Sequence, residues 1–390
     1  MIVQHSFDNQ DFSIAMLGGG QLGKMLLAEA GRLDIKINVL DPNSEAPAKK
    51  GANFFKKGDF KDYDTVIKFA SNADAVVIEI ESVNVEALEE LENRGIPCFP
   101  PSRILRIIQN KGRQKDFFRD HEIPTSDYKK YKNLESLKVD ISKGKRSLPF
   151  VWKIAEGGYD GFGVKIVKNL KDLDNLAKGE CIVESLEIIK KEIGVIVARD
   201  LNEEIIAFPP VQMEFHDDAN QVEFVTCPAE ISKNLSQKCT EMALSVGQSL
   251  KTNGLLAVEL FILEDDKIVV NELAPRPHNS GHLTIESCNV SQFEQLLRCA
   301  CQLPLSQVKL NSASVMANIV GEPGFEGLVK YVGLNDALKI DYAKLHLYGK
   351  TQTRPHRKMG HVTIISDSIE DARKKAKEFK SILLVQSKNL

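Results

Sequence analysis

The sequence predicts a protein of mixed α/β and α+β class with more than one domain, and three observations support this prediction. Strand-like and helix-like segments alternate over roughly the first hundred residues, which is typical of an open parallel sheet. Short strand-like segments then dominate up to about residue 270, which is typical of antiparallel sheets. The length of 390 residues exceeds what one hydrophobic core usually serves, so two or three domains are expected.

The N-terminal region carries the pattern of a Rossmann-like parallel sheet over residues 14–105, after a polar tail over residues 1–13. The tail contains Asp8 and Asp11, so it is not expected to be a signal peptide. Apolar runs of strand length alternate with helix-like runs and turn signals. The expected elements are strands at 13–17, 35–40, 75–80 and 96–99 and helices at 21–30 and 85–93.

The middle of the chain, residues 106–303, changes to short strands with few helices, so we expect an α+β domain with antiparallel sheets. Residues 304–390 are again rich in strand-like runs, with a final helix near 369–380, and predict a small β-rich domain. The strands expected in the middle region are 150–154, 163–167, 181–184, 191–198, 204–209, 221–227 and a hairpin over 258–272, with one long helix at 232–252.

Two glutamates, Glu259 and Glu272, lie at opposite ends of the hairpin. If Asp265 and Asp266 form the turn, these glutamates face each other, and directly opposed Cβ atoms lie only about 4.5–5.5 Å apart. Carboxylates that close repel each other unless a proton or a cation lies between them, and oxygen ligands on strands suit Mg²⁺. The pairs that this turn implies are Leu263 with Ile268, Phe261 with Val270 and Glu259 with Glu272.

The hairpin alone leaves two interpretations open. Asp-Asp is a weaker turn signal than Asn-Gly, and a slip of one residue would move one glutamate to the opposite face. A cation site and a pair of solvated strand ends are then equally good interpretations. The polar loop 274–282 that follows, which is rich in ligand-binding side chains, favours the cation site.

A glycine motif, Gly18-x-Gly20-x-x-Gly23, follows the first strand, and Asp41 ends the second. The pattern fits a dinucleotide-binding fingerprint, a phosphate or ligand cradle at a helix N-terminus, or a tight strand–helix turn. Because nothing else in the chain resembles a hydride-transfer site, we favour the ligand cradle.

A second glycine-rich loop, residues 155–164, follows the strand that carries Lys153. Glycines that join two strands give a mobile lid whose N–H groups can close on phosphate oxygens, and Lys153 supplies a point charge for a phosphate. The loop lacks the GK[ST] ending of a Walker motif. An ordinary flexible hairpin is the alternative, but the neighbouring glutamate pair favours a phosphate lid.

Two further segments are candidates for ligand binding. Glu79 and Glu81 put two carboxylates on one face at the end of a strand, where ligand site and solvated strand end are equally good interpretations. The loop 348–361 contains several basic residues with Gly and Pro between them, which favours an anion clamp over a solvated face.

Composition excludes several classes of protein. The net charge of −3 is spread along the chain, so neither nucleic acid nor a membrane surface is an expected partner. No apolar run approaches the roughly 18 residues that span a bilayer. Seven cysteines without a CxxC pair predict a reducing, cytoplasmic location. His278 and His282 are four residues apart, but Pro277 and Gly281 argue against a helix that would place both on one face. No Cys/His spacing typical of a zinc site occurs, so a zinc site is not expected.

Together these segments resemble the 5-(carboxyamino)imidazole ribonucleotide synthase family of ATP-grasp enzymes, over essentially the whole chain after residue 13. The resemblance implies a Rossmann-like domain, a central ATP-grasp domain of two α+β subdomains and a small C-terminal β-rich domain. The matching segments are 18–23 (GGGQLG), 40–42 (LDP), 157–161 (GGYDG), 271–282 (NELAPRPHNSGH), 291–295 (SQFEQ), 345–350 (LHLYGK) and 357–361 (RKMGH).

The resemblance implies that ATP binds between the two subdomains, with Lys111 and Lys153 on its phosphates and Glu192 on its ribose. Residues 184–187 would line the adenine pocket, and the glycine lid would close over the γ-phosphate. The implied ATP-binding residues are Lys111, Lys153, Tyr159, Asp160, Gly161, Phe162, Gly163, Val164, Lys165, Glu184, Ser185, Leu186, Glu187, Glu192, His216, Asn271 and Glu272.

The resemblance also implies a Mg²⁺ site at Glu259 and Glu272, where Mn²⁺ can substitute, and a binding site for 5-aminoimidazole ribonucleotide. The implied catalytic residues are Lys153, Tyr159, Asp160, Arg276 and His278. The implied ribonucleotide-binding residues are Gln21, Glu79, Tyr159, Asp160, His278, Asn279, Ser280, Lys350 and Arg357, with the last two on the phosphate.

The implied reaction converts ATP, bicarbonate and 5-aminoimidazole ribonucleotide to ADP, phosphate and the carboxyamino product. The resemblance also implies that the protein forms a homodimer. Phe162 stands where the family usually has a basic residue, and Lys165 is a candidate replacement for that charge. Another ATP-grasp carboxylase and a formate-dependent formyltransferase are alternatives, although the loop 357–361 argues against both. An NAD-dependent dehydrogenase, from a different class, rests only on the first glycine motif.

Overall fold

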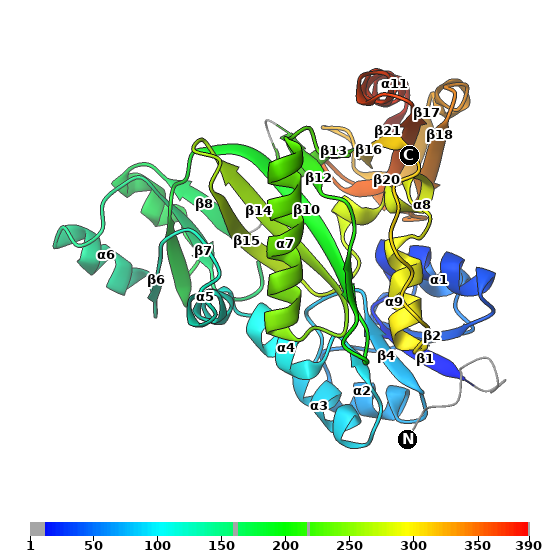
Figure 1. Cartoon of the computed structure of the whole chain (residues 1–390), viewed down its shortest axis with the longest axis horizontal. Helices are drawn as coiled ribbons and strands as arrows, with labels where there is room; N and C mark the ends of the chain where they lie inside the picture. The colour runs from blue at the N-terminus through cyan, green and yellow to red at the C-terminus, as the bar shows by residue number, and fades with distance from the viewer. Residues whose placement is uncertain (1–11, 159–162, 217–218, 389–390) are drawn as a thin grey trace.

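The computed structural model describes residues 12–158, 163–216 and 219–388, and its N-terminal part is the predicted parallel sheet (Figure 1). All pairings in this sheet are parallel, in the order β3-β2-β1-β4-β5. Its strands are β1 (Ser13–Leu17), β2 (Lys36–Asp41), β3 (Phe54–Lys57), β4 (Ala75–Ile78) and β5 (Cys98–Phe99).

Helices cover both faces of the parallel sheet because both faces of its strands are apolar. Along β1, Ile14 and Met16 belong to one buried cluster, whereas Ala15 and Leu17 belong to another. Strand β3 and helix α2 were not among the expected elements, since β3 is a short, partly exposed edge strand. The helices are α1 (Gln21–Arg32), α2 (Tyr63–Ala70), α3 (Val85–Asn93) and α4 (Ser102–Ile108).

A small α+β unit follows, in which an antiparallel sheet of order β6-β9-β7-β8 is combined with α5 and α6. Trp152 and Phe150 on β7 are buried in its core. Helix α5 begins with an Asn110 cap that places Lys111 in the first turn. The elements are α5 (Lys111–Asp120), β6 (Tyr128–Tyr131), α6 (Leu134–Ser142), β7 (Phe150–Ile154), β8 (Val164–Val167) and β9 (Cys181–Ser185).

The largest sheet runs in the order β15-β14-β10-β12-β13-β16-β20-β18, with β11 beside β10. It crosses the expected boundary at residue 304, because β13 pairs with β16. The C-terminal strands therefore extend the central sheet. The strands are β10 (Ile189–Arg199), β11 (Ile205–Ala207), β12 (Val211–His216), β13 (Ala219–Cys227), β14 (Gly254–Leu263), β15 (Ile268–Ala274), β16 (Ala313–Val320), β18 (Ala343–Leu347) and β20 (Lys358–Ser366).

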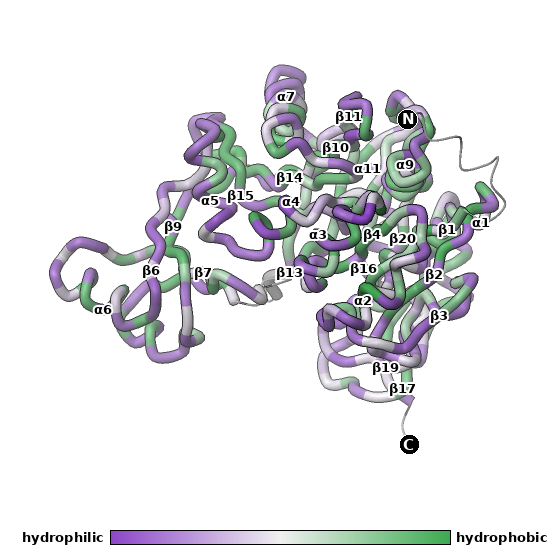
Figure 2. Tube along the Cα trace, turned by 90° about the horizontal axis from the view of Figure 1, so that it is seen from below, coloured by the Kyte–Doolittle hydropathy of each residue, from purple (hydrophilic) through white to green (hydrophobic). Residues whose placement is uncertain are grey.

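Helix α7 (Lys233–Leu250) lies across one face of this sheet (Figure 1). It corresponds to the long helix predicted at 232–252. Its buried residues form one cluster with Val258, Leu260 and Val270. On the opposite face of β14 and β15, Leu255, Ala257 and Ala274 belong to a second buried cluster, and the polar side chains of Glu259 and Glu272 follow along the strands. Figure 2 shows hydrophobic and hydrophilic residues alternating along α7, as expected of a helix with one buried face.

The remaining helices and strands join the domains and complete the C-terminal region. Helix α9 lies between the large sheet and the N-terminal domain, α8 contacts α9 and β20, and α11 covers β16 and β20. A small sheet has the order β19-β17-β21. These elements are α8 (Thr284–Ser287), α9 (Gln292–Ala300), β17 (Gly327–Val332), α10 (Leu334–Ala337), β19 (Gln352–Thr353), α11 (Ile369–Ile382) and β21 (Leu384–Ser387).

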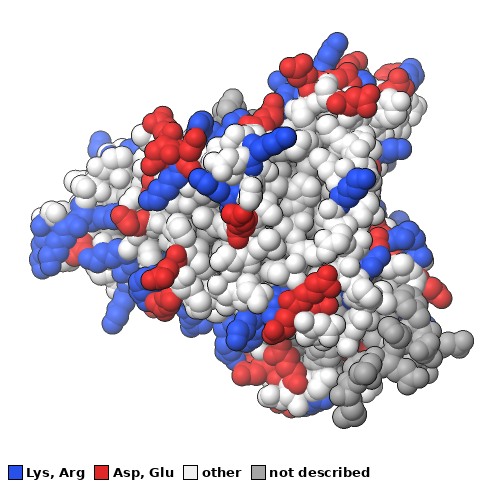
Figure 3. Space-filling model, in the orientation of Figure 1, with Lys and Arg blue, Asp and Glu red and all other residues white. Residues whose placement is uncertain are grey.

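Surface features agree with the composition. All seven cysteines are buried. Within the described residues, no helix is both long and apolar enough to cross a membrane. Figure 3 shows that Lys and Arg gather on the end of the molecule formed by β6 and α6, while the middle of this face mixes both signs and uncharged residues.

Candidate functional site

The structure confirms that Glu259 and Glu272 are cross-strand partners on β14 and β15. The register that led to this expectation was wrong near the turn. Phe261 pairs with Val269 and not with Val270, and Ile268 pairs with Ile262 and not with Leu263. The connecting loop is therefore longer than an Asp265–Asp266 turn.

A β-bulge restores the glutamate pair. The register shifts between Glu259 and Leu260, and Asn271 is the additional residue on β15. Side chains normally alternate between the faces of a strand, and a bulge redirects them. Asn271 accordingly reaches the same side as Glu259, and its Nδ2 donates to Glu259 Oε2 at 3.2 Å. The bulge thus adds an amide to the two carboxylates.

Lysines from the small subdomain neutralise part of this acidic cluster. Lys111 Nζ forms an ion pair with Glu272 Oε2. Lys153 Nζ donates to Asn271 Oδ1 at 3.0 Å and pairs with Glu184 Oε2 at 2.8 Å. These contacts bring Lys111, Lys153, Asn271 and Glu272 together, as the resemblance implies for the phosphate site.

Lys115 belongs to the same charge network, although sequence reasoning did not single it out. It lies 3.0 Å from Glu184 Oε1 and is 2% exposed. Burial lowers its pKa to about 8, against the opposing effect of Glu184. The signal was present in the sequence, because Lys111 and Lys115 are four residues apart and share one face of α5.

Glu184 was expected to line the adenine pocket, and its side chain has a further role. Burial acts to raise its pKa, but Lys153 and Lys115 outweigh burial and hold the pKa below its usual value. The Glu184 carboxylate therefore holds Lys115 and Lys153 in place through two ion pairs. Ser185, Leu186 and Glu187 follow at the end of β9, and their contact with adenine stays a prediction.

The paired glutamates differ in their ionisation. Burial and the neighbouring charge of Glu272 raise the pKa of Glu259 well above its usual value. Burial also disfavours the Glu272 carboxylate, but Lys111 and Lys153 lower its pKa below the usual value. Two carboxylates and an amide oxygen fit a Mg²⁺ ion that leaves its other positions to water and phosphate. Among the described residues, no group of three or more His, Cys, Asp and Glu forms a metal cage.

The loop after β15 brings His278 to this cluster. His278 Nε2 lies 3.4 Å from Glu259 Oε1, and His278 Nδ1 lies 2.9 Å from Ser280 Oγ. Asn279, expected to bind the ribonucleotide, instead exchanges two hydrogen bonds with Asn318 on β16, at 3.0 and 2.9 Å. The Asn279 side chain is thus engaged in holding the loop.

The first glycine motif is filled by the protein's own carboxylates, which corrects the expected ligand cradle. The N–H groups of Gly20 and Gly23 donate to Glu79 at 2.5 and 2.9 Å. Gly19 N–H donates to Asp41 Oδ2 at 2.7 Å. An anion is favourable at a helix N-terminus, and Glu79 and Asp41 supply it here. This arrangement also argues against a dinucleotide site.

Glu81 and Arg276 link the N-terminal domain to the loop after β15. Arg276 Nε lies 2.8 Å from Glu81 Oε1. Glu79 and Glu81 were expected to act on one face, but the first turns to the glycine motif and the second to Arg276. The predicted catalytic role of Arg276 stays a prediction.

The basic C-terminal loop lies against the start of α1. Lys24 Nζ donates to Leu347 O at 2.6 Å, and Lys350 Nζ donates to Lys358 O at 2.7 Å. Gly349, with φ of +79°, lies so near that an added Cβ would be 3.3 Å from Lys24 Nζ. Gln21 and Lys350, both expected to bind the ribonucleotide, therefore lie on neighbouring elements. Arg357 Nη1 donates to Gln352 O at 2.7 Å.

The structure tests only part of the glycine lid. Tyr159, Asp160, Gly161 and Phe162 lie outside the described residues. Lys165 is described, and it does not replace the basic residue expected at the lid. It is the cross-strand partner of Trp152, so it lies on the core side of the subdomain sheet, opposite to the adjacent Lys153, and its Nζ donates to Asn175 O at 2.9 Å.

Two more expected nucleotide contacts lie on the large sheet. Burial raises the pKa of Glu192 to about 7, against the opposing effect of Lys153. His216, at the end of β12, places its ring 5.9 Å from that of His356, centroid to centroid. The roles of Gly163, Val164, Glu192 and His216 in binding ATP stay predictions.

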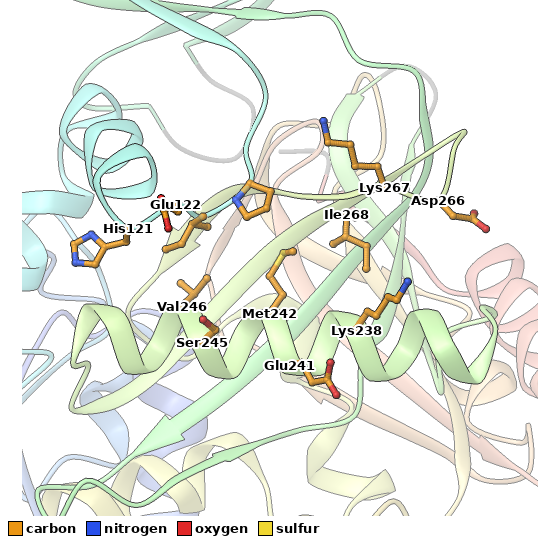
Figure 4. A pocket seen from close by; sticks show the side chains of 12 residues that line it. His121, Glu122, Lys238, Glu241, Met242, Ser245, Val246, Asp266, Lys267 and Ile268 are labelled. Atoms are coloured by element: carbon orange, nitrogen blue, oxygen red, sulfur yellow. The ribbon is translucent and has the colours of Figure 1, made fainter.

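A groove of about 470 Å³ lies elsewhere, between α7 and the hairpin (Figure 4). Met242 and Val246 from α7 and Ile268 from β15 point into it, beside Lys238 and Glu241. These side chains come from the α7 side of the sheet, whereas the glutamate pair faces the small subdomain. The groove is separate from the charge network.

Family models match three successive parts of the chain. They describe a ribonucleotide synthetase preATP-grasp domain over residues 12–109, an ATP-grasp domain over 116–293 and a phosphoribosylaminoimidazole carboxylase C-terminal domain over 314–375. The large sheet that crosses residue 304 joins the last two.

Individual relatives extend the match over nearly the whole chain. An N5-carboxyaminoimidazole ribonucleotide synthase of Bacillus subtilis is 35% identical over 357 residues, which cover 90% of this chain and 91% of the relative. The crystal structure of an N5-carboxyaminoimidazole ribonucleotide synthetase from Thermotoga maritima is 40% identical, with a TM-score of 0.88, over 97% of this chain and all of that chain. An Aspergillus clavatus N5-carboxyaminoimidazole synthase in complex with ADP and 5-aminoimidazole ribonucleotide is 31% identical, with a TM-score of 0.86, over 96% and 98% of the two chains.

Proposed function

The chain belongs to the N5-carboxyaminoimidazole ribonucleotide synthase family, and from this premise we infer that it carboxylates 5-aminoimidazole ribonucleotide at the expense of ATP. It is an ATP-grasp ligase that forms a carbon–nitrogen bond and releases ADP and phosphate, in purine biosynthesis. One observation supports this function most directly: Glu259 and Glu272 form one cluster with Lys111 and Lys153, next to the loop that contains His278.

The reaction has two group transfers. A bicarbonate oxygen attacks the γ-phosphorus of ATP, the bond to the bridging oxygen breaks, and ADP leaves as carboxyphosphate forms. The exocyclic amine of the ribonucleotide then attacks the carboxyl carbon of carboxyphosphate, or CO₂ released from it, and phosphate leaves as the amine loses a proton. No side-chain nucleophile is needed in either transfer.

The described residues support this chemistry electrostatically. Lys111 and Lys153 place two positive charges where the phosphates of ATP would lie, which stabilises the charge that develops during transfer. Glu259, Glu272 and Asn271 would hold Mg²⁺, or Mn²⁺ in its place, and the bound ion would neutralise phosphate charge and orient the leaving group. Glu192 would accept hydrogen bonds from the ribose.

The ribonucleotide is placed by the loop side chains and by the C-terminal basic loop. His278 and Ser280 lie beside the metal ligands, while Lys350 and Arg357 lie on the loop that contacts α1. Gln21 and Glu79 belong to the same part of the N-terminal domain. This arrangement supports a site in which the phosphate of the ribonucleotide meets the basic loop and its amine faces the nucleotide. A homodimer is the assembly that the family resemblance suggests.

A coupled assay of ADP release tests the function. With Mg²⁺ present, ADP release is expected to require both 5-aminoimidazole ribonucleotide and bicarbonate, and omission of either should reduce the rate to the background ATPase level. Equal rates with and without the ribonucleotide would refute the assignment. Enhanced NADH fluorescence on mixing would instead support the dehydrogenase alternative.

A further inference from the structure

Two buried glutamines on α9, Gln292 and Gln295, form the same kind of contact with different segments of the chain. Both side chains are fully buried. Each amide accepts a hydrogen bond from the N–H of one residue and donates to the C=O of that same residue. Gln292 does this at His278, and Gln295 does it at Ser306.

The contact at His278 fixes the backbone of the residue that reaches the metal ligands. His278 N–H donates to Gln292 Oε1 at 2.8 Å, and Gln292 Nε2 donates to His278 O at 2.9 Å. Gln292 Nε2 also lies 3.2 Å from His282 Nδ1. An amide side chain offers a donor and an acceptor in this fixed arrangement whatever the pH, whereas a glutamate does so only when it is protonated.

The loop packs so closely that it leaves His278 little freedom. A Cβ added at Gly281 would lie 2.2 Å from Ile196 Cδ1 and 2.7 Å from Gln292 Cδ. A Cβ added at Gly194 on β10 would lie 2.9 Å from Ser280 Oγ. The loop is therefore held against β10 on one side and α9 on the other.

The imidazole of His278 extends from this fixed backbone toward Glu259, with Ser280 Oγ at its other nitrogen. The His278 C=O also accepts from Gly281 N–H at 3.0 Å, but burying the His278 N–H without a partner would be costly, so the Gln292 amide stabilises the loop in this one conformation. A displacement of about 1 Å at such a group is enough to reduce a rate by about a hundredfold.

We propose that Gln292 is a positioning residue for the carboxylation reaction, which holds the His278 backbone so that the imidazole lies beside Glu259 and the ribonucleotide. The proposal rests on the proposed function and assigns a role to the segment 291–295. Gln292 acts through His278 and does not itself touch the substrates.

The test compares Gln292→Glu with its matched control Gln295→Glu. A carboxylate still accepts from the backbone N–H but cannot donate to the C=O, and the two variants make this change on the same helix at equal burial. We expect Gln292→Glu to lower kcat for ribonucleotide-dependent ADP release by about tenfold or more, with KM for ATP within about threefold. Gln295→Glu should lose less than about threefold in kcat, while both lose similar thermal stability.

Acidification gives a second readout that a purely structural role would not move. A protonated glutamic acid can again donate to His278 O, so the activity of Gln292→Glu relative to the wild type should rise as the pH falls, whereas the ratio for Gln295→Glu should stay flat. Equal activity losses in the two variants, or a flat ratio for both, would overturn the proposal. If Gln292→Glu does not fold, Gln292→Met and Gln295→Met replace the pair under the same kcat criterion.

The outcomes separate this inference from the proposed function. Wild-type protein that shows no ribonucleotide-dependent ADP release refutes the function itself. Active wild-type protein with an equally active Gln292→Glu variant refutes only the positioning role.

Discussion

Two pairs of glutamates, Glu79 with Glu81 and Glu259 with Glu272, were both candidate ligand sites in the sequence and have different surroundings in the structure. Glu79 accepts two backbone N–H bonds from the glycine motif, and Glu81 pairs with Arg276. In the hairpin, Glu272 has Lys111, while Glu259 keeps a raised pKa because burial and Glu272 act on it together.

The difference between the two pairs teaches that the hydrogen-bond and ion-pair donors around the carboxylates, more than the distance between them, distinguish a structural pair from a candidate cation site. The first pair has its own donor for each carboxylate, so it can hold two segments together without a ligand. The second pair is placed by the bulge with too little positive charge nearby, so a divalent ion improves its electrostatics. Substituting each kind of glutamate should therefore have different consequences.

The largest effect is expected from Glu272→Gln. Removing one of the two carboxylates proposed to hold Mg²⁺ should lower ADP release by about a hundredfold or more, because metal stabilisation of the transferring phosphoryl group is worth several kcal/mol. Ribonucleotide-dependent ADP release measures the loss, and circular dichroism checks the fold. Glu264→Gln, exposed at the turn of the same hairpin, is the control. Retained activity in Glu272→Gln would remove the metal role from this pair.

A moderate effect on stability is expected from Glu79→Gln. The amide can accept only one of the two N–H bonds from Gly20 and Gly23 and presents a donor to the other, which should lower the free energy of unfolding by about 1–3 kcal/mol. Denaturant unfolding measures this change. Glu90→Gln, which removes an exposed ion pair with Arg94, should cost less than about 1 kcal/mol. If the two variants were equally stable, the backbone bonds of Glu79 would not hold the glycine motif.

The smallest effect is a pH-dependent gain in stability from Glu192→Gln. Burial raises the pKa of Glu192 to about 7, so the folded state binds a proton that the unfolded state has already released. The contribution of the Glu192 carboxyl to the stability of the wild type is fully present at low pH and is lost as the pH rises toward about 7. The variant should therefore melt at a higher temperature than the wild type at about pH 8 and at the same temperature at about pH 4. Calorimetry without nucleotide measures the difference. A difference that is constant with pH would contradict the burial of this carboxyl.

Local patterns in the sequence predicted the parts of the site that depend on short separations. The hairpin pattern predicted that Glu259 faces Glu272. The four-residue spacing on α5 would also have predicted that Lys115 lies on the same helix face as Lys111. The bulge escaped prediction because Asn271 looks like any other strand residue. The predicted pair was right although the expected turn was wrong, since the longer loop and the bulge change the register by one residue in opposite directions.

Contacts between distant segments could not be predicted in the same way. The side chain of Asn279 was assigned to the substrate, yet Asn318 engages it from another domain. The glycine motif resembled an empty cradle because nothing local shows that Glu79 occupies it. Strand β3 was also missed because it is a short, partly exposed edge strand. Helix α9 was missed although its amphipathic pattern and its Ser291 cap could have been recognised in the sequence.

The extra residue in β15 has a consequence for how this site can vary through descent. A substitution at Asn271 changes one side chain, whereas deletion of its codon would give a regular ladder in which Glu259 still faces Glu272 but the amide beside Glu259 is lost. The extra residue therefore decides whether the glutamate pair has an amide beside it. Lineages that use this amide should accept many replacements elsewhere in the hairpin while keeping the bulge and its asparagine.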